Sequence, residues 1–392
     1  MTPRTIILAT LAALAMSGPA SALECGDDLA AWKAAVAEEA KQAGVGERGL
    51  SALADARIDP EVLKRDRAQG VFSQTFAEFS GRMINAYRLK HGAANLKKYA
   101  DVFARADREY GVQAPVIAAF WALETDFGAV QGDFDTLNAL LTLAHDCRRP
   151  ELFRPQLVPL LTLIDRGIVP EDVKGAWAGE IGQTQILPSD YLKLGQDGDG
   201  DGAVDLRGSA PDVILTTAAK IASRGWKRDQ PWLQEVRVPD DLPWQETGRM
   251  NKLPLSKWAE WGVTDRNGGP LLDNGYPAGL VLPMGHKGPA FLAYDNYEVY
   301  LEWNQSFIYT LTAAHLAARL AGDPAFDPRN PQQGLSGGAM KDLQEKLVAK
   351  GYDVGGIDGI LGNNTREAVR QEQQRLGLPV DGWPTPELLA KL

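Results

Sequence analysis

Apolar residues recur along this chain at the spacing of an α-helix, and no long series of segments alternates as strands would. Leu29, Trp32, Val36 and Ala40 form one such stripe within 27–43. Segments with the same character are 95–110, 116–127, 136–144, 151–165, 211–224 and 307–320. The stretch 232–282 is rich in Pro, Trp and Gly and has room for short strands or a loop-rich subdomain. This pattern predicts a mainly α protein with one irregular subdomain.

Charge and composition exclude some classes of protein. The 392 residues include 41 Lys and Arg against 51 Asp and Glu, a formal net charge of −10. An acidic chain is a poor binder of nucleic acid, because that binding depends on basic side chains at the phosphates. The four His and two Cys form no cluster with the spacing of a zinc site. An apolar fraction of 44% is enough for the cores of two or three domains.

The first 22 residues have the features of a secretory signal peptide. Arg4 is followed by an apolar run, 6–16, and then by the small residues Ala20, Ser21 and Ala22. That run is about half of the ~20 residues needed to span a bilayer. We therefore expect cleavage, export to the periplasm and no stable membrane anchor, the alternative being an uncleaved anchor. In an oxidising compartment Cys25 and Cys147 are able to pair, the alternative being two separate thiols.

A boundary near 323–338 separates a body from a small C-terminal module. Pro follows Asp323, Asp327 and Asn330, and Gly is frequent in 334–338. We expect a body at 23–325, a linker at 326–337 and a module at 338–392. Within the module the pattern predicts helices at 341–350 and 365–376, a Gly- and Asp-rich loop between them, and a final helical turn.

One carboxyl stands out in the segment FWALETDFG, 120–128. In a helix, Glu124 shares a face with Ile117, Phe120 and Trp121. An apolar environment raises the pKa of a carboxyl, as a general acid needs near neutral pH. Asp126 is expected to point elsewhere, toward solvent. The alternatives are a structural Glu paired with a basic residue and a metal ligand, although no suitably spaced His accompanies it.

Several blocks in this order resemble the membrane-bound lytic transglycosylase B family of murein-cleaving enzymes (glycoside hydrolase family 103), in a secreted form. They are ALETDFG at 122–128, DCRRPELF at 146–153, GAWAGEIGQTQILPSDY at 175–191, DGDGDGAVDL at 197–206 and, more loosely, NYEVYLEWNQSFIY at 296–309. Independently, 343–382 resembles the widespread peptidoglycan-binding module of three short helices. The resemblance implies a lysozyme-like helical catalytic domain with a small loop-rich subdomain, followed by that module.

The family resemblance implies that Glu124 is the single acid/base. It would protonate the oxygen between MurNAc and GlcNAc, then take the proton of the MurNAc 6-hydroxyl, which closes a 1,6-anhydro ring without water. The chemistry needs no cofactor. The resemblance also implies sugar contacts for one group of side chains, which comprises Gln185, Tyr87, Trp303, Asn304 and Tyr309.

The implied partners are the glycan strands and stem peptides of peptidoglycan. Arg148 and Arg149 match a pair that would meet stem-peptide carboxylates, and the planar guanidinium group suits that role. The alternative is a solvated helix start.

Two other functions stay open. A hydrolytic muramidase would need a second carboxyl near Glu124, and Asp126 and Asp133 are the nearby candidates in the sequence. A non-enzymatic protein that binds the wall would need only the C-terminal module.

The stretch 197–205 follows the start of a calcium-binding loop. Asp197, Asp199 and Asp201 stand at positions 1, 3 and 5, Ala203 at 7 and Asp205 at 9. Position 12, ordinarily a bidentate Glu, is Gly208 here. We expect weak, structural calcium binding, the alternative being an Asp/Gly turn that holds no metal.

Overall fold

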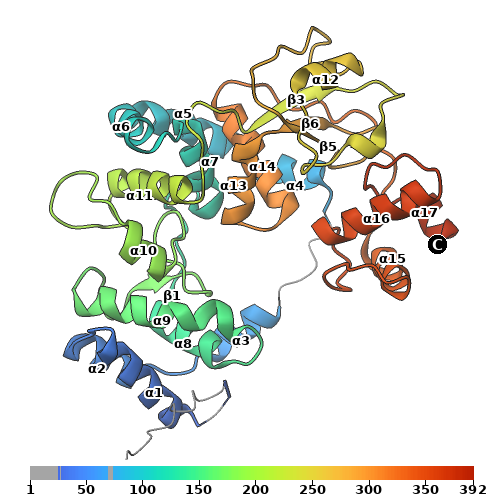
Figure 1. Ribbon diagram of the computed structural model, residues 1–392. Helices are drawn as coiled ribbons and strands as arrows, with labels where there is room; N and C mark the ends of the chain where they lie inside the picture. The colour runs from blue at the N-terminus through green and yellow to red at the C-terminus, as the bar shows by residue number, and fades with distance from the viewer. Residues whose placement is uncertain (1–24, 27, 69–73) are drawn as a thin grey trace, which may run out of the picture.

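The computed structural model describes residues 25–26, 28–68 and 74–392. The predicted signal peptide, 1–22, lies outside these residues. Most of the described chain is helical, as the periodicity predicts (Figure 1). Among the described residues, no helix is both long enough and apolar enough to cross a membrane.

The body contains two groups of packed helices (Figure 1). The first group is α1 (Leu29–Gln42), α2 (Glu47–Asp55), α3 (Pro60–Arg67), α8 (Thr136–His145), α9 (Pro150–Asp165) and α10 (Pro188–Leu194). The second is α4 (Phe76–Met83), α5 (Ala86–Lys98), α6 (Ala100–Tyr110), α7 (Ala114–Thr125), α11 (Ala210–Ser223), α13 (Asp295–Trp303) and α14 (Phe307–Leu320). In the first group α9 contacts α1, α2, α8 and α10, and in the second α14 contacts α4, α5, α7 and α13. α10 and α11 join the two groups.

The helix expected at 95–110 is interrupted. Tyr99 leaves the helical conformation, with φ −109° and ψ 29°, so α5 ends at Lys98 and α6 begins at Ala100. The Tyr99 ring lies 6.0 Å from that of Trp121 on α7, centroid to centroid, and the Lys98 ammonium lies over its face. Packing against α7 therefore accompanies a break that the apolar stripe alone does not predict.

A two-stranded ribbon fixes the segment that follows α9. β1 (Phe134–Asp135) pairs antiparallel with β2 (Lys174–Gly175), with Phe134 opposite Gly175. A Cβ at Gly175 would come within 2.2 Å of the Glu180 carbonyl, so this close approach requires glycine. The ribbon starts the block 175–191 beside the chain that leaves α7.

The irregular stretch after 232 contributes to a small antiparallel sheet. Its order is β4 (Thr264–Asp265), β3 (Leu233–Arg237), β6 (Ala290–Ala293) and β5 (Gly279–Val281). A short 3-10 helix, η1 (Trp244–Glu246), and the helix α12 (Leu255–Glu260) lie in the connections. The sheet has its own apolar core, in which Trp258 is fully buried and donates Nε1–H to the Ala278 carbonyl at 2.8 Å.

The C-terminal module consists of α15 (Gly337–Ala349), α16 (Asn363–Arg375) and α17 (Pro386–Lys391) around a separate core. It packs against the body. The buried Arg366 donates from Nη2 to the Pro283 carbonyl at 2.9 Å, and its guanidinium lies 4.4 Å from the Phe307 ring centroid. Arg370 Nη1 donates to Thr247 Oγ1 at 2.9 Å. The module is therefore fixed to the body by buried polar contacts.

Candidate functional site

The helix α7 places a carboxyl inside the body. Its sequence is apolar on all sides apart from Glu124 and Thr125, and nine of its twelve residues are buried. Such a helix belongs in a core, where it packs against neighbours on every side. Glu124 is its only charged residue and is half-buried, so part of the carboxyl side chain remains accessible.

The chain leaves α7 through a strained turn. Asp126, Phe127 and Gly128 all have positive φ, at 51°, 61° and 89°. Gln183 holds this turn: its Oε1 accepts from Trp121 Nε1 at 2.9 Å, and its carbonyl accepts from Thr125 Oγ1 at 2.5 Å. A Cβ at Gly128 would lie 2.5 Å from the Gln183 amide oxygen. Strain of this kind persists only where the surroundings fix it, as at functional sites.

Two donors converge on the carboxyl of Glu124. Trp303, at the end of α13, donates from Nε1 to Glu124 Oε1 at 2.9 Å. Tyr309, in the first turn of α14, donates its hydroxyl to the same oxygen. The connection between the two helices is short, so the end of α13 and the start of α14 place both donors beside Glu124. The Trp303 ring stacks on Phe120, one helical turn before Glu124, with centroids 4.3 Å apart.

Burial has the largest effect on the pKa of Glu124. Loss of water raises the pKa of this carboxyl above its ordinary 4.5, against the opposing effect of the Tyr309 and Trp303 hydrogen bonds and the nearby Lys220 charge. The Tyr309 pKa is raised well above its ordinary 10, chiefly by burial and further by Glu124, so its hydroxyl stays a donor. The arrangement can keep Glu124 protonated at a pH where an exposed Glu is ionised.

The other predicted sugar contacts lie in different settings. Gln185 has φ 52° and donates from Nε2 to the Gly182 carbonyl at 2.9 Å, within the loop that holds the end of α7. Asn304 lies in the connection before α14, where its Oδ1 accepts from the N–H of the N-cap residue Ser306 at 2.9 Å. Tyr87, on α5, is 46% exposed and lies against the His91 ring. Whether these three bind sugar is a prediction that no contact here tests.

The predicted pair at the start of α9 already has an internal partner. Arg148 Nη1 donates to the buried Asp66 carboxylate at 2.5 Å, and Arg149 binds its other oxygen. The two cations lower the pKa of Asp66 against the effect of its burial. The Arg148 side chain is still 44% exposed and that of Arg149 29%, so Asp66 orients both groups without covering them.

The structure changes the list of second carboxyls near Glu124. The Asp126 side chain is 33% exposed, in line with the expected solvent-facing position, and it also forms an ion pair at 2.7 Å with the buried Arg88. Asp133 is exposed. The carboxyl that interacts electrostatically with Glu124 is instead Glu180. Its pKa is raised mainly by burial and further by the Glu124 charge. Among the described residues, Glu180 Oε2 has no hydrogen-bond partner.

A buried cation, Lys220, completes this cluster and was also missed. The signal that singled out Glu124, a charge within an apolar helical run, is equally present in ILTTAAKIAS at 214–223. Glu180 was likewise visible inside the block 175–191. A charge on a pattern of helical period, such as Lys220, is usually assigned to the solvated face, and Glu180 lies in a segment that has no periodic pattern.

The acidic loop partly matches its prediction. Carboxylate oxygens of Asp197, Asp199 and Asp212 lie within 4.8 Å of one another, which suits a hard cation with oxygen ligands. Asp212, at the start of α11, was not predicted, whereas Gly208, at position 12 of the motif, has no carboxylate to offer. Asp201 and Asp205 do not join this trio: Asp201 accepts from Ala203 N–H, and Asp205 from the amides of Arg207 and Gly208.

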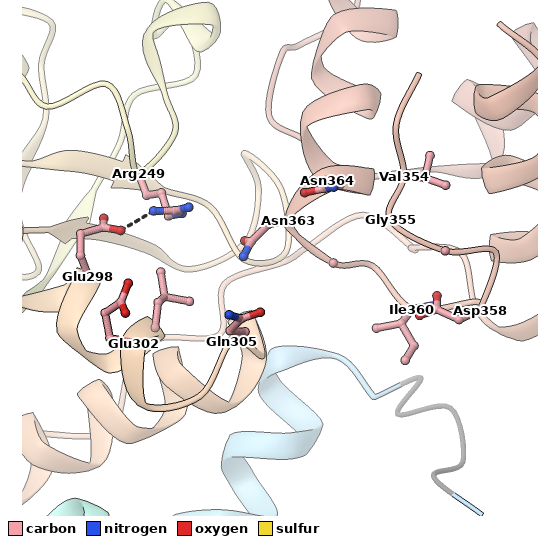
Figure 2. Close-up of a pocket in the computed structure, with 13 residues that line it drawn as sticks. Arg249, Glu298, Glu302, Gln305, Val354, Gly355, Asp358, Ile360, Asn363 and Asn364 are labelled. Carbon is pink, nitrogen blue, oxygen red and sulfur yellow. Dashed lines mark hydrogen bonds and ion pairs between the residues drawn. The ribbon is translucent and has the colours of Figure 1, made fainter. Parts of the chain in front are cut away.

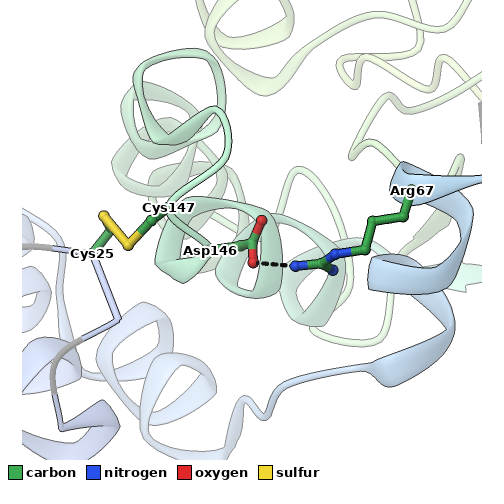
Figure 3. The surroundings of a disulfide bond; sticks show 4 residues. All are labelled: Cys25, Arg67, Asp146 and Cys147. Atoms are coloured by element: carbon green, nitrogen blue, oxygen red, sulfur yellow. Dashed lines mark hydrogen bonds and ion pairs between the residues drawn. A yellow bond between two sulfur atoms is a disulfide. The ribbon is translucent and has the colours of Figure 1, made fainter.

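The two cysteines are joined (Figure 3). Cys25 and Cys147 form a disulfide with their Cα atoms 5.1 Å apart. The neighbouring Asp146 binds Arg67 at the end of α3 at 2.8 Å. The Gly26 amide donates to the His145 carbonyl at 2.9 Å, so the chain before α1 is fastened to the end of α8.

A polar cavity of about 500 Å³ lies between the module and the body (Figure 2). On the body side it is lined by the ion pair of Arg249 with Glu298, and by Glu302, which follows on the same helix. On the module side it is lined by Asn363 and Asn364, at the start of α16. The helix α13 therefore borders this cavity and also carries Trp303, the donor to Glu124.

Family models match both parts of the chain. The model described as "Transglycosylase SLT domain" matches residues 28–318, and that described as "Putative peptidoglycan binding domain" matches residues 336–392. Membrane-bound lytic murein transglycosylase B of Escherichia coli (strain K12) is 28% identical over 243 residues. That match covers 61% of this chain and 66%, just under two thirds, of the relative.

Solved structures give a longer match. The crystal structure of SltB3 from Pseudomonas aeruginosa in complex with NAG-anhNAM-pentapeptide is 35% identical, with a TM-score of 0.85, over 93% of this chain and 99% of that chain. The Escherichia coli lytic transglycosylase Slt35 in complex with calcium is 26% identical, with a TM-score of 0.60, over 73% of this chain and 92% of that chain.

Proposed function

Because the chain belongs to the transglycosylase SLT family of lytic transglycosylases, we propose that it cleaves the MurNAc–GlcNAc β-1,4 bond of peptidoglycan without water and leaves 1,6-anhydroMurNAc ends. The observation that carries this proposal is Glu124, an accessible carboxyl with a raised pKa that two neutral donors hold in a buried helix. A SltB3 relative complexed with an anhydro sugar product supports the same chemistry.

In the proposed reaction Glu124 acts twice. As an acid it transfers its proton to the glycosidic oxygen while the C1–O bond of MurNAc breaks, and the 2-acetamido group stabilises the positive charge at C1. As a carboxylate it then takes the proton of the MurNAc 6-hydroxyl, whose oxygen bonds to C1. The proton count balances, and no water is consumed. A positioned acid/base of this kind contributes about 10²–10⁴ to the rate.

The remaining predicted residues have supporting roles in this proposal. Trp303 and Tyr309 orient Glu124, and Gln185, Asn304 and Tyr87 contact the sugars. Arg148 and Arg149, oriented by Asp66, meet carboxylates of the stem peptide.

The module helps to bind the wall. We assign the catalytic body to 23–325, the linker to 326–337 and the peptidoglycan-binding module to 338–392. The cavity between module and body is proposed as the place where both contact one strand, since α13 connects it to the site of Glu124. The disulfide and the signal peptide expected at 1–22 support a periplasmic location.

Product analysis separates transglycosylation from hydrolysis. Purified sacculi digested with the protein are expected to yield anhydro ends, each one water lighter than a reducing end, by mass spectrometry. Reducing ends would contradict the proposal and favour a muramidase.

Glu180 is the observation that favours the hydrolytic alternative, since it is a second, half-buried carboxyl that interacts electrostatically with Glu124. A hydrolase would use it on water or on C1. We expect Glu180→Gln to retain the anhydro product. Loss of all cleavage in this variant, with its fold intact, would assign Glu180 a direct part in the chemistry.

We also propose that Asp197, Asp199 and Asp212 hold a structural calcium ion, supported by their geometry and by the calcium complex of Slt35. Calcium at 100 times its dissociation constant should raise the Tm by about 5 °C, and a chelator should reverse this. Differential scanning calorimetry measures the shift. Asp199→Asn should lose it, whereas Asp172→Asn, at an exposed position outside the cluster, should keep it. An identical Tm with calcium and with chelator would contradict the proposal.

A further inference from the structure

A lysine is buried beside the site of Glu124. Lys220 lies in the last turn of α11 and is 7% exposed, in a run otherwise composed of apolar and small residues. Lysine is almost never buried to this degree unless its charge is paired, because removing an ammonium group from water is costly. The residues around Lys220 must therefore explain why it is there.

The ammonium group is held from two sides. Lys220 Nζ lies 3.4 Å from Asp190 Oδ2 on α10 and 4.1 Å from the ring centroid of Trp303 on α13. A cation at this distance from an indole face is attracted by the ring. Asp190 also binds Arg224, on the same side of α11 one turn later, at 3.2 Å. The lysine is thus anchored by Asp190 against the tryptophan.

The Trp303 ring links Lys220 to the carboxyl of Glu124. One contact of the ring is the Lys220 cation, another is Phe120 on α7, and its Nε1–H donates to Glu124 Oε1. An indole that is held at its ring points its single donor in a fixed direction. Moving Lys220 would therefore move or loosen the hydrogen bond at Glu124.

The Lys220 charge also acts on this carboxyl, where it opposes the rise in pKa that burial causes. The charged and titratable groups that face the cluster are Glu124 of α7, Glu180 after β2, Asp190 of α10, Arg224 at the end of α11, Tyr309 of α14 and, beside Tyr309, Arg88 of α5. Asp190 is shared by two cations, and Tyr309 stays neutral. Glu124 and Glu180 interact electrostatically with Lys220, and each carboxylate disfavours ionisation of the other.

We propose that Lys220 is a positioning residue for Glu124: it holds the Trp303 indole that donates to this carboxyl, and its charge balances the carboxylate that forms when Glu124 gives up its proton. The inference rests on the proposed function of Glu124 as the acid. In the first step negative charge appears on Glu124 in a site with little water, where a fixed cation stabilises it most. Lys220 would not touch the sugar.

The variant Lys220→Met tests this role, because methionine keeps most of the side-chain volume and removes the charge. Initial rates of glycan cleavage on a soluble peptidoglycan fragment should show kcat reduced by about 10- to 100-fold. KM should stay within about threefold, because the lysine does not meet the substrate. The alkaline limb of the kcat–pH profile should move to higher pH, since loss of the cation raises the Glu124 pKa and its acid form persists longer.

Matched variants separate positioning from general damage. Lys220→Arg keeps the positive charge, so the alkaline limb of its kcat–pH profile should lie at the same pH as in the wild type. Lys257→Met removes an ion-paired lysine of α12, which carries no residue of the site, and should leave kcat unchanged. Asp190→Asn removes the carboxylate that pairs with Lys220 but leaves the lysine itself in place, and it should reduce kcat several-fold. This variant keeps the inference testable if Lys220→Met does not fold.

Failure of the role proposed for Lys220 can be distinguished from failure of the proposed transglycosylase function. The rate assay counts cleavage with anhydro or reducing ends alike, so reducing ends from the wild type would overturn the transglycosylase but still allow Lys220 to be tested. An unchanged kcat and an unchanged alkaline limb in folded Lys220→Met would overturn the role of Lys220. No cleavage by the wild type would overturn both.

Discussion

The variant Glu124→Gln is expected to lose peptidoglycan cleavage by about 10²–10⁴-fold. Glutamine has the same shape, and its amide oxygen can still accept from Trp303 and Tyr309, so the site should stay assembled. It has no acidic proton for the glycosidic oxygen, and it cannot take a proton from the 6-hydroxyl. Release of muropeptides from sacculi measures the loss. Sedimentation with sacculi should show unchanged wall binding, because the C-terminal module is untouched.

The same variant has a stability signature that is independent of substrate. Burial raises the folded-state pKa of Glu124 above the unfolded value. The contribution of Glu124 to the free energy of unfolding is therefore fully present below about pH 4, and it is lost as the pH rises through the folded-state pKa. Glu124→Gln should therefore match the wild-type Tm at low pH and exceed it at neutral pH. Glu109→Gln, on the exposed side of α6, is the control and should change neither Tm nor activity. Wild-type cleavage by Glu124→Gln would remove Glu124 as the acid.

Local patterns were sufficient for much of the fold. Periodicity located about half of the described helices of the body and the helical module, because an amphipathic or fully apolar helix marks its buried side in the sequence. It gave no prediction for α2, α3, α4, α10, α12 and α13. It could not find the break at Tyr99, where a ring packs on a helix distant in sequence. It also left 232–282 unassigned, since strands of two to five residues are too short to show alternation.

Local sequence patterns also predicted part of the site. Glu124 was visible as a charge on an apolar face, and Trp303 and Tyr309 were named only through a family resemblance. That these two donors share one oxygen of Glu124 depends on the packing of α13 and α14 against α7, which no local pattern encodes. Lys220 and Glu180 show the limit most clearly. Each resembled an ordinary charge until tertiary structure placed both in one buried cluster.

The acidic loop makes a similar point. Spacing within 197–205 predicted ligands by analogy with a continuous calcium loop. The structure instead turns Asp201 and Asp205 toward local amides and brings in Asp212 from the next helix. A linear motif assumes that consecutive positions share one loop geometry, and that assumption failed from Asp201 onward.

Removing the disulfide should have the largest effect on stability. The bond joins residues 122 positions apart, and closing a loop of that length lowers the entropy of the unfolded chain by an amount equivalent to about 5 kcal/mol. The double variant Cys25→Ser/Cys147→Ser should therefore unfold at much lower denaturant concentration than the oxidised wild type, if unfolding is a single transition. Chemical denaturation followed by circular dichroism measures this difference. The reduced wild type should behave like the double variant.

Activity distinguishes a global role for the bond from a local one. Cys147 follows α8 and Cys25 precedes α1, both in the first group of helices, whereas Glu124, Trp303 and Tyr309 belong to the second. The folded double variant should therefore keep the wild-type kcat. Unfolding of α1 alone is the competing outcome: its Trp32 packs edge-on against His145, and loss of the bond would then expose this tryptophan in a separate, earlier transition. A two-step denaturation curve, with the second midpoint unchanged, would show that the disulfide stabilises only the N-terminal helix and not the fold around Glu124.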